Sequence, residues 1–219
     1  MKNYSLAERL CHKIDEKTRP ILAPFRRKAL ERTDFSIISN NCWGGICYEY
    51  YGLRKLSPTV GMYFFADEYI RFLNDIKHYL GVPISLVSAQ ESRYFKELEK
   101  RGQLDVPVGV LEDVEIVMLH YKDREVAKEK WMRRVERVNW NNIIYKFSYM
   151  NGCSDRHIRQ FEELCDRDRV NHFEFVSHPF DEYPDAYVIA PGTDGQIEND
   201  TFYWNKYCDV KKIINRGGK

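Results

Sequence analysis

The sequence predicts an α/β fold: a mostly parallel sheet with helices on both faces, in a Rossmann-like three-layer arrangement. Short apolar runs rich in β-branched residues alternate with longer segments whose apolar residues recur every three to four positions. That order of strands and helices is typical of a parallel sheet covered on both faces. No internal repeat or low-complexity linker divides the 219 residues. We therefore expect an N-terminal helical arm over residues 1–34 and a single α/β domain over residues 35–219.

Seven short apolar segments are predicted strands, because they are rich in β-branched or aromatic residues. They span residues 35–39, 60–65, 84–87, 114–121, 143–148, 173–176 and 187–189. We expect 114–121 to be a core strand of the same sheet as 35–39. Residues 88–106 are polar and mixed in character, and we interpret them as a strand-loop excursion.

Helices are predicted between these strands from apolar residues on one face and capping residues at the ends. Gly52 and Gly81 end two of them, and Asp123 and Ser154 begin two others. The predicted helices span residues 45–53, 66–80, 123–138, 154–164 and 200–214.

The predicted arm is a helix over residues 5–30 that Pro20 and Pro24 interrupt. Lysine and arginine residues make it basic. We favour a solvated helix face. The alternative is an arm that lies near an anionic membrane surface or a partner.

Composition limits the function classes. A net charge of +1 provides no basic field for nucleic acid, so we expect no nucleic-acid partner. The N-terminus has no secretory signal, and no stretch approaches the roughly 20 apolar residues of a transmembrane helix. We expect a cytoplasmic protein. Its six cysteines form no Cys-x-x-Cys pair, so we expect them to be thiols.

The turn at residues 39–45 combines polar side chains with glycines where a core strand ends and a helix begins. In open α/β sheets, ligands bind beyond the carboxyl ends of strands, and a helix N-terminus offers free N–H groups. We therefore predict a substrate-binding turn. Asn-Asn is also common in ordinary turns, and cysteine and tryptophan often only fill a core. The predicted binding residues of this turn are Ser39, Asn40, Asn41, Trp43, Gly44 and Gly45, and the predicted nucleophile is Cys42.

His120 is the best candidate for a general base, because imidazole titrates near neutral pH. We expect it to lie on the same sheet edge as Cys42. Such a pair permits nucleophilic catalysis. The alternative is a histidine that packs at a strand end.

Arg134 and Arg137 are the predicted phosphate-binding pair, because guanidinium groups grip phosphate well. Their helix also carries Lys130 and Arg133, so a solvated basic face explains the pattern equally well. A phosphate-bearing donor, either coenzyme A or a sugar nucleotide, is the ligand class that this pair would suit.

No metal site is predicted. Asp166 and Asp168 form an Asp-x-Asp string, but it follows a helix in a polar loop and more plausibly solvates that loop. His178 lies among acidic residues after a late strand, where a capped turn is the favoured interpretation.

Several unusual strings resemble, in order, a bacterial family of unknown function (DUF 1919 type) whose members are often labelled exopolysaccharide-biosynthesis proteins. The likeness covers residues from about 35 to 190, and it includes Arg134 and Arg137. The strings are ISNNCWGG (38–45), YGL (51–53), SPTVG (57–61), LHY (119–121), WMRRVERVN (131–139) and NGC (151–153). The resemblance implies a role in making or modifying a surface glycan, without an established reaction. The turn is also similar in position to a Gly-Asn-Cys-Gln string of acyltransferase-like capsule proteins, but Cys42 has no Gln after it.

Together these observations predict an acyl or glycosyl transferase that acts on a surface glycan or its precursor, in association with membrane assembly machinery. Two alternatives stay open: a non-catalytic glycan- or nucleotide-binding component of a polysaccharide assembly complex, and an esterase acting on the glycan.

Overall fold

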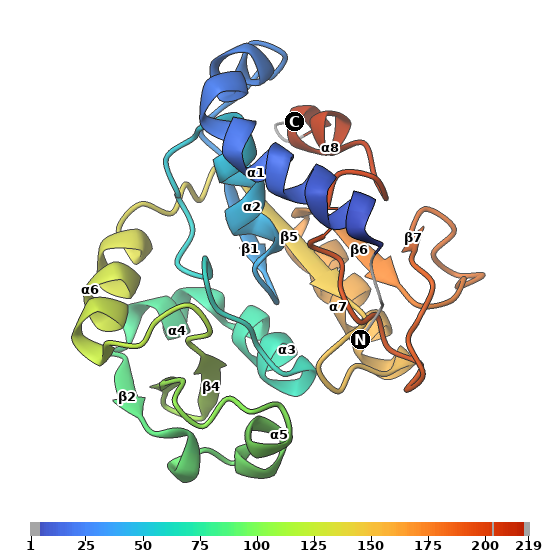
Figure 1. The fold of residues 1–219 in the computed structure, drawn as a ribbon. Coiled ribbons are helices and arrows are strands. Elements are labelled where there is room, and N and C mark those ends of the chain that lie inside the picture. Colours follow the sequence, from blue (N-terminus) through green and yellow to red (C-terminus); the bar gives the residue numbers. More distant parts are fainter. Residues whose placement is uncertain (1–4, 203, 217–219) are drawn as a thin grey trace.

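The main sheet of the computed structural model is a four-stranded parallel sheet, and the structure describes residues 5–202 and 204–216 (Figure 1). Its strand order is β1-β5-β6-β7, and every pair is parallel. The carboxyl ends of all four strands therefore meet at one edge. The strands are β1 (Ser36–Ser39), β5 (Ile143–Ser148), β6 (Asn171–Val176) and β7 (Tyr187–Val188). The predicted α/β class and parallel sheet are confirmed.

A separate antiparallel sheet of order β2-β3-β4 was not predicted. It comprises β2 (Ser85–Val87), β3 (Val108–Leu111) and β4 (Val114–Val117). Residues 112 and 113 join β3 to β4 in a tight hairpin, with Glu112 at φ 54°. The short helices η1 (Ala89–Glu91) and α5 (Phe95–Lys100) lie between β2 and β3. In Figure 1 these green elements lie apart from the main sheet.

This second sheet corrects three predictions. The expectation that 114–121 is a core strand of the main sheet was wrong, because β4 pairs with β3 and ends at Val117. The segment 60–65 is not a strand, since only Tyr63 forms a bridge, to Val117. The Rossmann-like three-layer arrangement is therefore not confirmed.

The helices differ from the predictions mainly at their ends. The first stays continuous through Pro20 and Pro24, and the predicted helix 66–80 breaks at Asp75, whose side chain caps the next helix by accepting from His78 N. The tail becomes helical only at Val210. The helices are α1 (Leu6–Arg27), α2 (Trp43–Tyr51), α3 (Ala66–Asn74), α4 (Ile76–Gly81), α6 (Arg124–Val135), α7 (Asp155–Asp168) and α8 (Val210–Arg216).

Helix α1 lies across α2 (Figure 1). The two approach closely at Gly52, which has φ 60° and ends α2. A Cβ atom there would lie 2.9 Å from that of Ala23, so glycine allows both the turn and the contact. This contact places the polar face of α1 beside the turn that follows β1.

The two faces of the main sheet bury separate cores, because successive strand residues point to opposite sides. Phe147 packs against Phe161 of α7 on one face, and Phe173 packs against Trp43 of α2 on the other. None of the helices in the described part of the chain combines the length and apolar character that crossing a bilayer requires.

Candidate functional site

A buried charged cluster closes the carboxyl edge of the main sheet. Lys146, near the end of β5, has no exposed surface, and its ammonium contacts Asp200, Ser148 and Asn41. Burial lowers the pKa of Lys146, while the charge of Asp200 and the hydrogen bond to it act in the opposite direction. Asp200 comes from the C-terminal segment, so this ion pair fastens that segment to the sheet.

The side chains of the two asparagines in the turn at 39–45 form hydrogen bonds within the protein that hold this edge of the sheet together. Asn41 donates to both carboxylate oxygens of Asp200, at 2.9 and 3.0 Å, and accepts from Trp43 N at 3.1 Å. Asn40 exchanges two hydrogen bonds with the backbone of Ser148. Both side chains are buried, so their amide donors face protein rather than solvent.

A cleft of about 520 Å³ lies beside this turn, and Cys42 and Gly45 are among its lining residues. Its walls come from α1, α2, α6 and the segments around residues 60, 120 and 200. The lining residues include His12, Glu16, Arg19, Cys42, Gly45, Glu49, Lys55, His120, Tyr121, Lys130 and Arg134. Four of them are Lys or Arg and two are Glu, so the cleft carries a positive balance.

Arg19 is the most unusual group in the cleft wall. Only 7% of the residue is exposed, and its Nε donates to Asp15 at 2.8 Å. Its Nη2 is buried without a hydrogen-bond partner among the described residues. A buried donor left unpaired costs about 1–3 kcal/mol, and more for a charged group, which makes Arg19 a candidate for binding an acceptor in the cleft. Nη1 of Arg26, on the same helix, is also buried without a partner among the described residues.

Arg134 faces the same cleft from α6. Its Nη1 donates to the carbonyl of Val60 at 2.9 Å and to the hydroxyl of Tyr121 at 2.5 Å, which fixes the guanidinium in the wall. Lys130, one turn earlier, lies over the Tyr121 ring at 5.2 Å. Arg137 does not line the cleft.

Cys42 and His120 line the same cleft although they come from different parts of the fold. His120 follows β4 of the antiparallel sheet, and its backbone N–H donates to Gly61. Burial, reinforced by the charge of Asp200, raises the pKa of the Cys42 thiol to about 12. At neutral pH the group is a thiol, whereas the thiolate is the nucleophilic form.

Of the remaining residues of the predicted turn, Ser39, Trp43 and Gly44 do not line the cleft. Ser39 and Trp43 are buried, and the indole N–H of Trp43 donates to the carbonyl of Trp204 at 3.0 Å. A Cβ atom on Gly44 would lie 3.1 Å from Ile37, and one on Gly45 would lie 3.0 Å from Val60. Close packing of α2 thus accounts for both glycines, although Gly45 also lines the cleft.

Sequence reasoning missed the residues that α1 and the C-terminal segment contribute. In the sequence, Arg19 is one of several basic residues of the predicted arm, and Asp200 is the first residue of the predicted helix 200–214. Lys146 carried a signal that was overlooked, because a lysine inside the apolar strand 143–148 requires a buried partner.

Comparisons with known proteins match most of the length of this chain. Residues 14–215 match a domain family described as a domain of unknown function, DUF1919. The chain belongs to this family. An uncharacterized protein of Haemophilus influenzae is 26% identical over 201 residues, which is 90% of each chain. The family match begins within α1, so residues 14–27 of this helix, including Arg19, belong to the DUF1919 domain.

Proposed function

We propose that this DUF1919 protein binds a phosphate-bearing donor, a sugar nucleotide or coenzyme A, in the cleft between α1, α2 and α6. The proposal depends on the buried, unpartnered Nη2 of Arg19 in a cleft with a positive balance. A phosphate oxygen supplies the missing acceptor, and guanidinium groups bind phosphate with charge-assisted hydrogen bonds. Arg134 and Lys130 would hold the rest of the phosphate group.

The donor would transfer a glycosyl or acyl group to a hydroxyl of a surface-glycan precursor, as the resemblance to exopolysaccharide-biosynthesis proteins implies. The acceptor oxygen attacks the anomeric or thioester carbon, and the bond from that carbon to phosphate oxygen or to sulfur breaks. The leaving group departs with the electron pair, and His120 accepts the hydroxyl proton. This direct transfer needs no covalent step on Cys42, whose thiol stays protonated.

A second candidate is a binding component without turnover. The raised pKa of Cys42 agrees with it as it does with direct transfer, because neither function uses the thiol as a nucleophile. Both functions require the same anionic ligand.

Binding is tested by calorimetry with uridine diphosphate sugars and coenzyme A, using Arg19→Gln and Arg134→Gln. We expect each variant to weaken binding at least about tenfold, the loss of one charge-assisted hydrogen bond. The matched control is Arg133→Gln, because Arg133 is exposed on α6 and pairs with Glu129. Equal weakening in the control, or no binding of either ligand class to the wild type, would overturn the proposal.

Turnover separates the two candidates. With donor and glycan acceptor, a transferase should lose about 100-fold or more of its rate in His120→Gln and keep its rate in Cys42→Ser. A binding component would hold the donor and show no turnover in any form.

We also propose that α1 rests on an anionic membrane surface, which would place the protein at the cytoplasmic side of glycan assembly. The polar face of α1 packs on the protein, and its apolar face points outward. Lys13 and Lys17 lie near this face and complement anionic headgroups. The apolar face consists of Leu6, Leu10, Ile14, Ile21 and Phe25, which are 52–86% exposed.

A further inference from the structure

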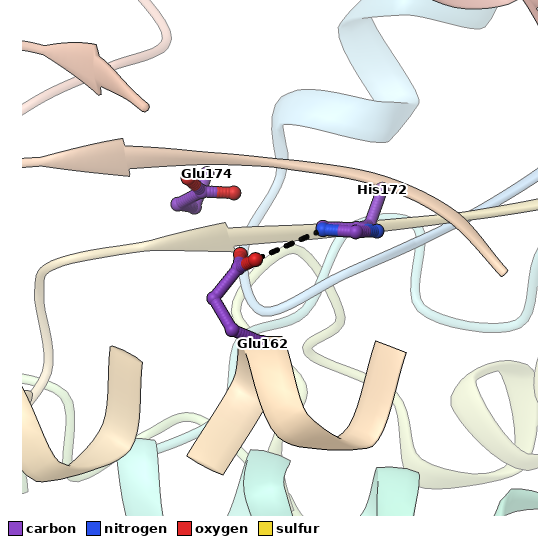
Figure 2. A group of neighbouring side chains, drawn as sticks. All are labelled: Glu162, His172 and Glu174. Carbon is purple, nitrogen blue, oxygen red and sulfur yellow. Dashed lines mark hydrogen bonds and ion pairs between the residues drawn. The ribbon is translucent and has the colours of Figure 1, made fainter. Parts of the chain in front are cut away.

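Three potential metal ligands meet between α7 and β6, away from the cleft. Figure 2 shows Glu162 of α7 projecting toward His172 and Glu174 of β6. His172 and Glu174 are two residues apart on one strand, so they share a face of the sheet. One ligand atom from each of the three side chains lies within 4.8 Å of the others.

One carboxylate oxygen of this group is buried without a partner among the described residues. Glu174 is only 5% exposed, and its ligand atom lies within 4.8 Å of those of Glu162 and His172. The Oε1 atom of Glu162 is buried without a partner, and its Oε2 atom contacts His172 Nε2 at 3.2 Å. Two adjacent carboxyl groups in a largely buried place repel each other when both are ionised, and a cation bound between them would remove that repulsion.

The histidine of this group is oriented as a metal ligand. Its Nδ1 lies 3.0 Å from the carbonyl oxygen of Val170. A carbonyl only accepts, so Nδ1 carries a hydrogen, and Nε2 is the ring nitrogen that faces Glu162. An incoming metal ion would displace any proton on Nε2 and use its lone pair. Metal-binding histidines usually donate their other ring N–H in this way. The ring of Phe161 packs edge-on against the imidazole and limits its rotation.

We propose that Glu162, His172 and Glu174 bind a divalent transition-metal ion of the zinc type. Ligands about 2.0–2.1 Å from a tetrahedral Zn²⁺ ion lie roughly 3.3 Å from one another, close to the 3.2 Å between His172 Nε2 and Glu162 Oε2. Imidazole with carboxylate is a donor set that Zn²⁺ accepts. Three protein ligands leave a position for water, as in catalytic rather than structural zinc sites.

The test is Zn²⁺ binding to chelator-treated full-length protein, measured by calorimetry and by thermal unfolding. We expect one equivalent of Zn²⁺ to bind and to raise the melting temperature, because the ion binds only the folded chain. Glu174→Gln and His172→Gln should each lower the affinity at least tenfold. Co²⁺ in place of Zn²⁺ should give a visible absorption spectrum that both variants lose.

Two controls separate metal binding from a structural role. Glu163→Gln changes an exposed carboxylate next to Glu162 on α7 and should leave Zn²⁺ binding unchanged. A merely structural role of His172 would lower the melting temperature of the metal-free variant but would preserve its response to Zn²⁺. The proposal is wrong if the wild type binds no Zn²⁺, or if Glu174→Gln binds it as tightly as the wild type does.

Discussion

At the scale of single residues, the pair of Lys146 and Asp200 decides how the carboxyl edge of the sheet is built. Neither side chain has more than about 1% of its surface exposed. Each charge is tolerated inside the protein because the other is present and because Asn41 and Ser148 complete its hydrogen bonds. The turn beside the cleft thus takes its shape from a residue far along the chain.

Removing one member of the Lys146–Asp200 pair should destabilise the protein much more than removal of both members would suggest. Lys146→Met leaves the Asp200 carboxylate buried and unpaired, which should lower the free energy of unfolding by about 3–5 kcal/mol. In the double variant that combines Lys146→Met with Asp200→Asn, the loss of unfolding free energy should fall well below the sum of the losses in the two single variants. Urea unfolding of the four proteins measures this coupling, with the exposed Lys128→Met as control. Additive losses would show that the pair is not coupled.

The residues of the cleft and of the proposed metal site show how much of each site could be predicted from the sequence. The turn at 39–45 and Arg134 could be singled out because a strand end and basic helical positions are visible locally, and both contribute to the cleft wall. His120 lines the cleft too, but from beyond β4 of the antiparallel sheet and not from the end of a main-sheet strand. Arg19 and Asp200 could not be singled out, because only the docking of α1 and of the C-terminal segment brings them to the turn. The metal ligands were missed for a related reason: Glu162 lies on a helix ten residues before His172, and nothing local links them.

At the scale of elements, the parallel strands were predictable from their apolar, β-branched runs. The antiparallel sheet was harder, because β2, β3 and β4 are only three or four residues long. Their pairing depends on a hairpin at residues 112–113 that contains no glycine. The continuity of α1 was also missed: two prolines did not break it, and its Ser5 capping box and the burial of Arg19 and Ala23 support it.

The exposed apolar face of α1 should be required for binding to an anionic membrane. Replacing Ile14 and Phe25 by glutamate places charges on its exposed apolar face, so binding to phosphatidylglycerol vesicles should fall at least about tenfold. Co-sedimentation measures the bound fraction, and added salt should weaken binding of the wild type. Met132→Glu is the matched control, because Met132 is similarly exposed on α6.

Two results would contradict a membrane role for α1. The first is vesicle binding by the double variant that equals that of the wild type. The second is a wild-type dimer that the double variant dissociates in solution, since the apolar face of α1 would then cover a second copy of this chain.

At the scale of the whole molecule, a buried carboxylate adds to the apolar core by which the antiparallel sheet packs on the main body, where Val114 and Ile116 belong to the same buried cluster as Phe147. Glu68 of α3 is 1% exposed. Its oxygens accept from the backbone N–H of Glu115 in β4 at 2.7 Å and from the hydroxyl of Tyr94 at 2.9 Å. Arg71 and Arg93 lie within 3.4 Å and balance its charge. The small sheet is thus tied to α3 by apolar packing and charge-assisted hydrogen bonds rather than by strand pairing with the main sheet.

Glu68→Ala should therefore destabilise the antiparallel sheet more than the main parallel sheet. We expect a loss of about 3 kcal/mol in unfolding free energy, since the backbone N–H of Glu115 and two arginines lose their buried acceptor. Amide hydrogen exchange should speed up across 85–117, while β5 and β6 keep most of their protection, because a region that loses a buried interaction can open locally before the rest of the protein unfolds. Glu99→Ala, an exposed change on α5, should alter neither region. Equal acceleration in both sheets would mean that they unfold as one unit and that Glu68 supports the whole core.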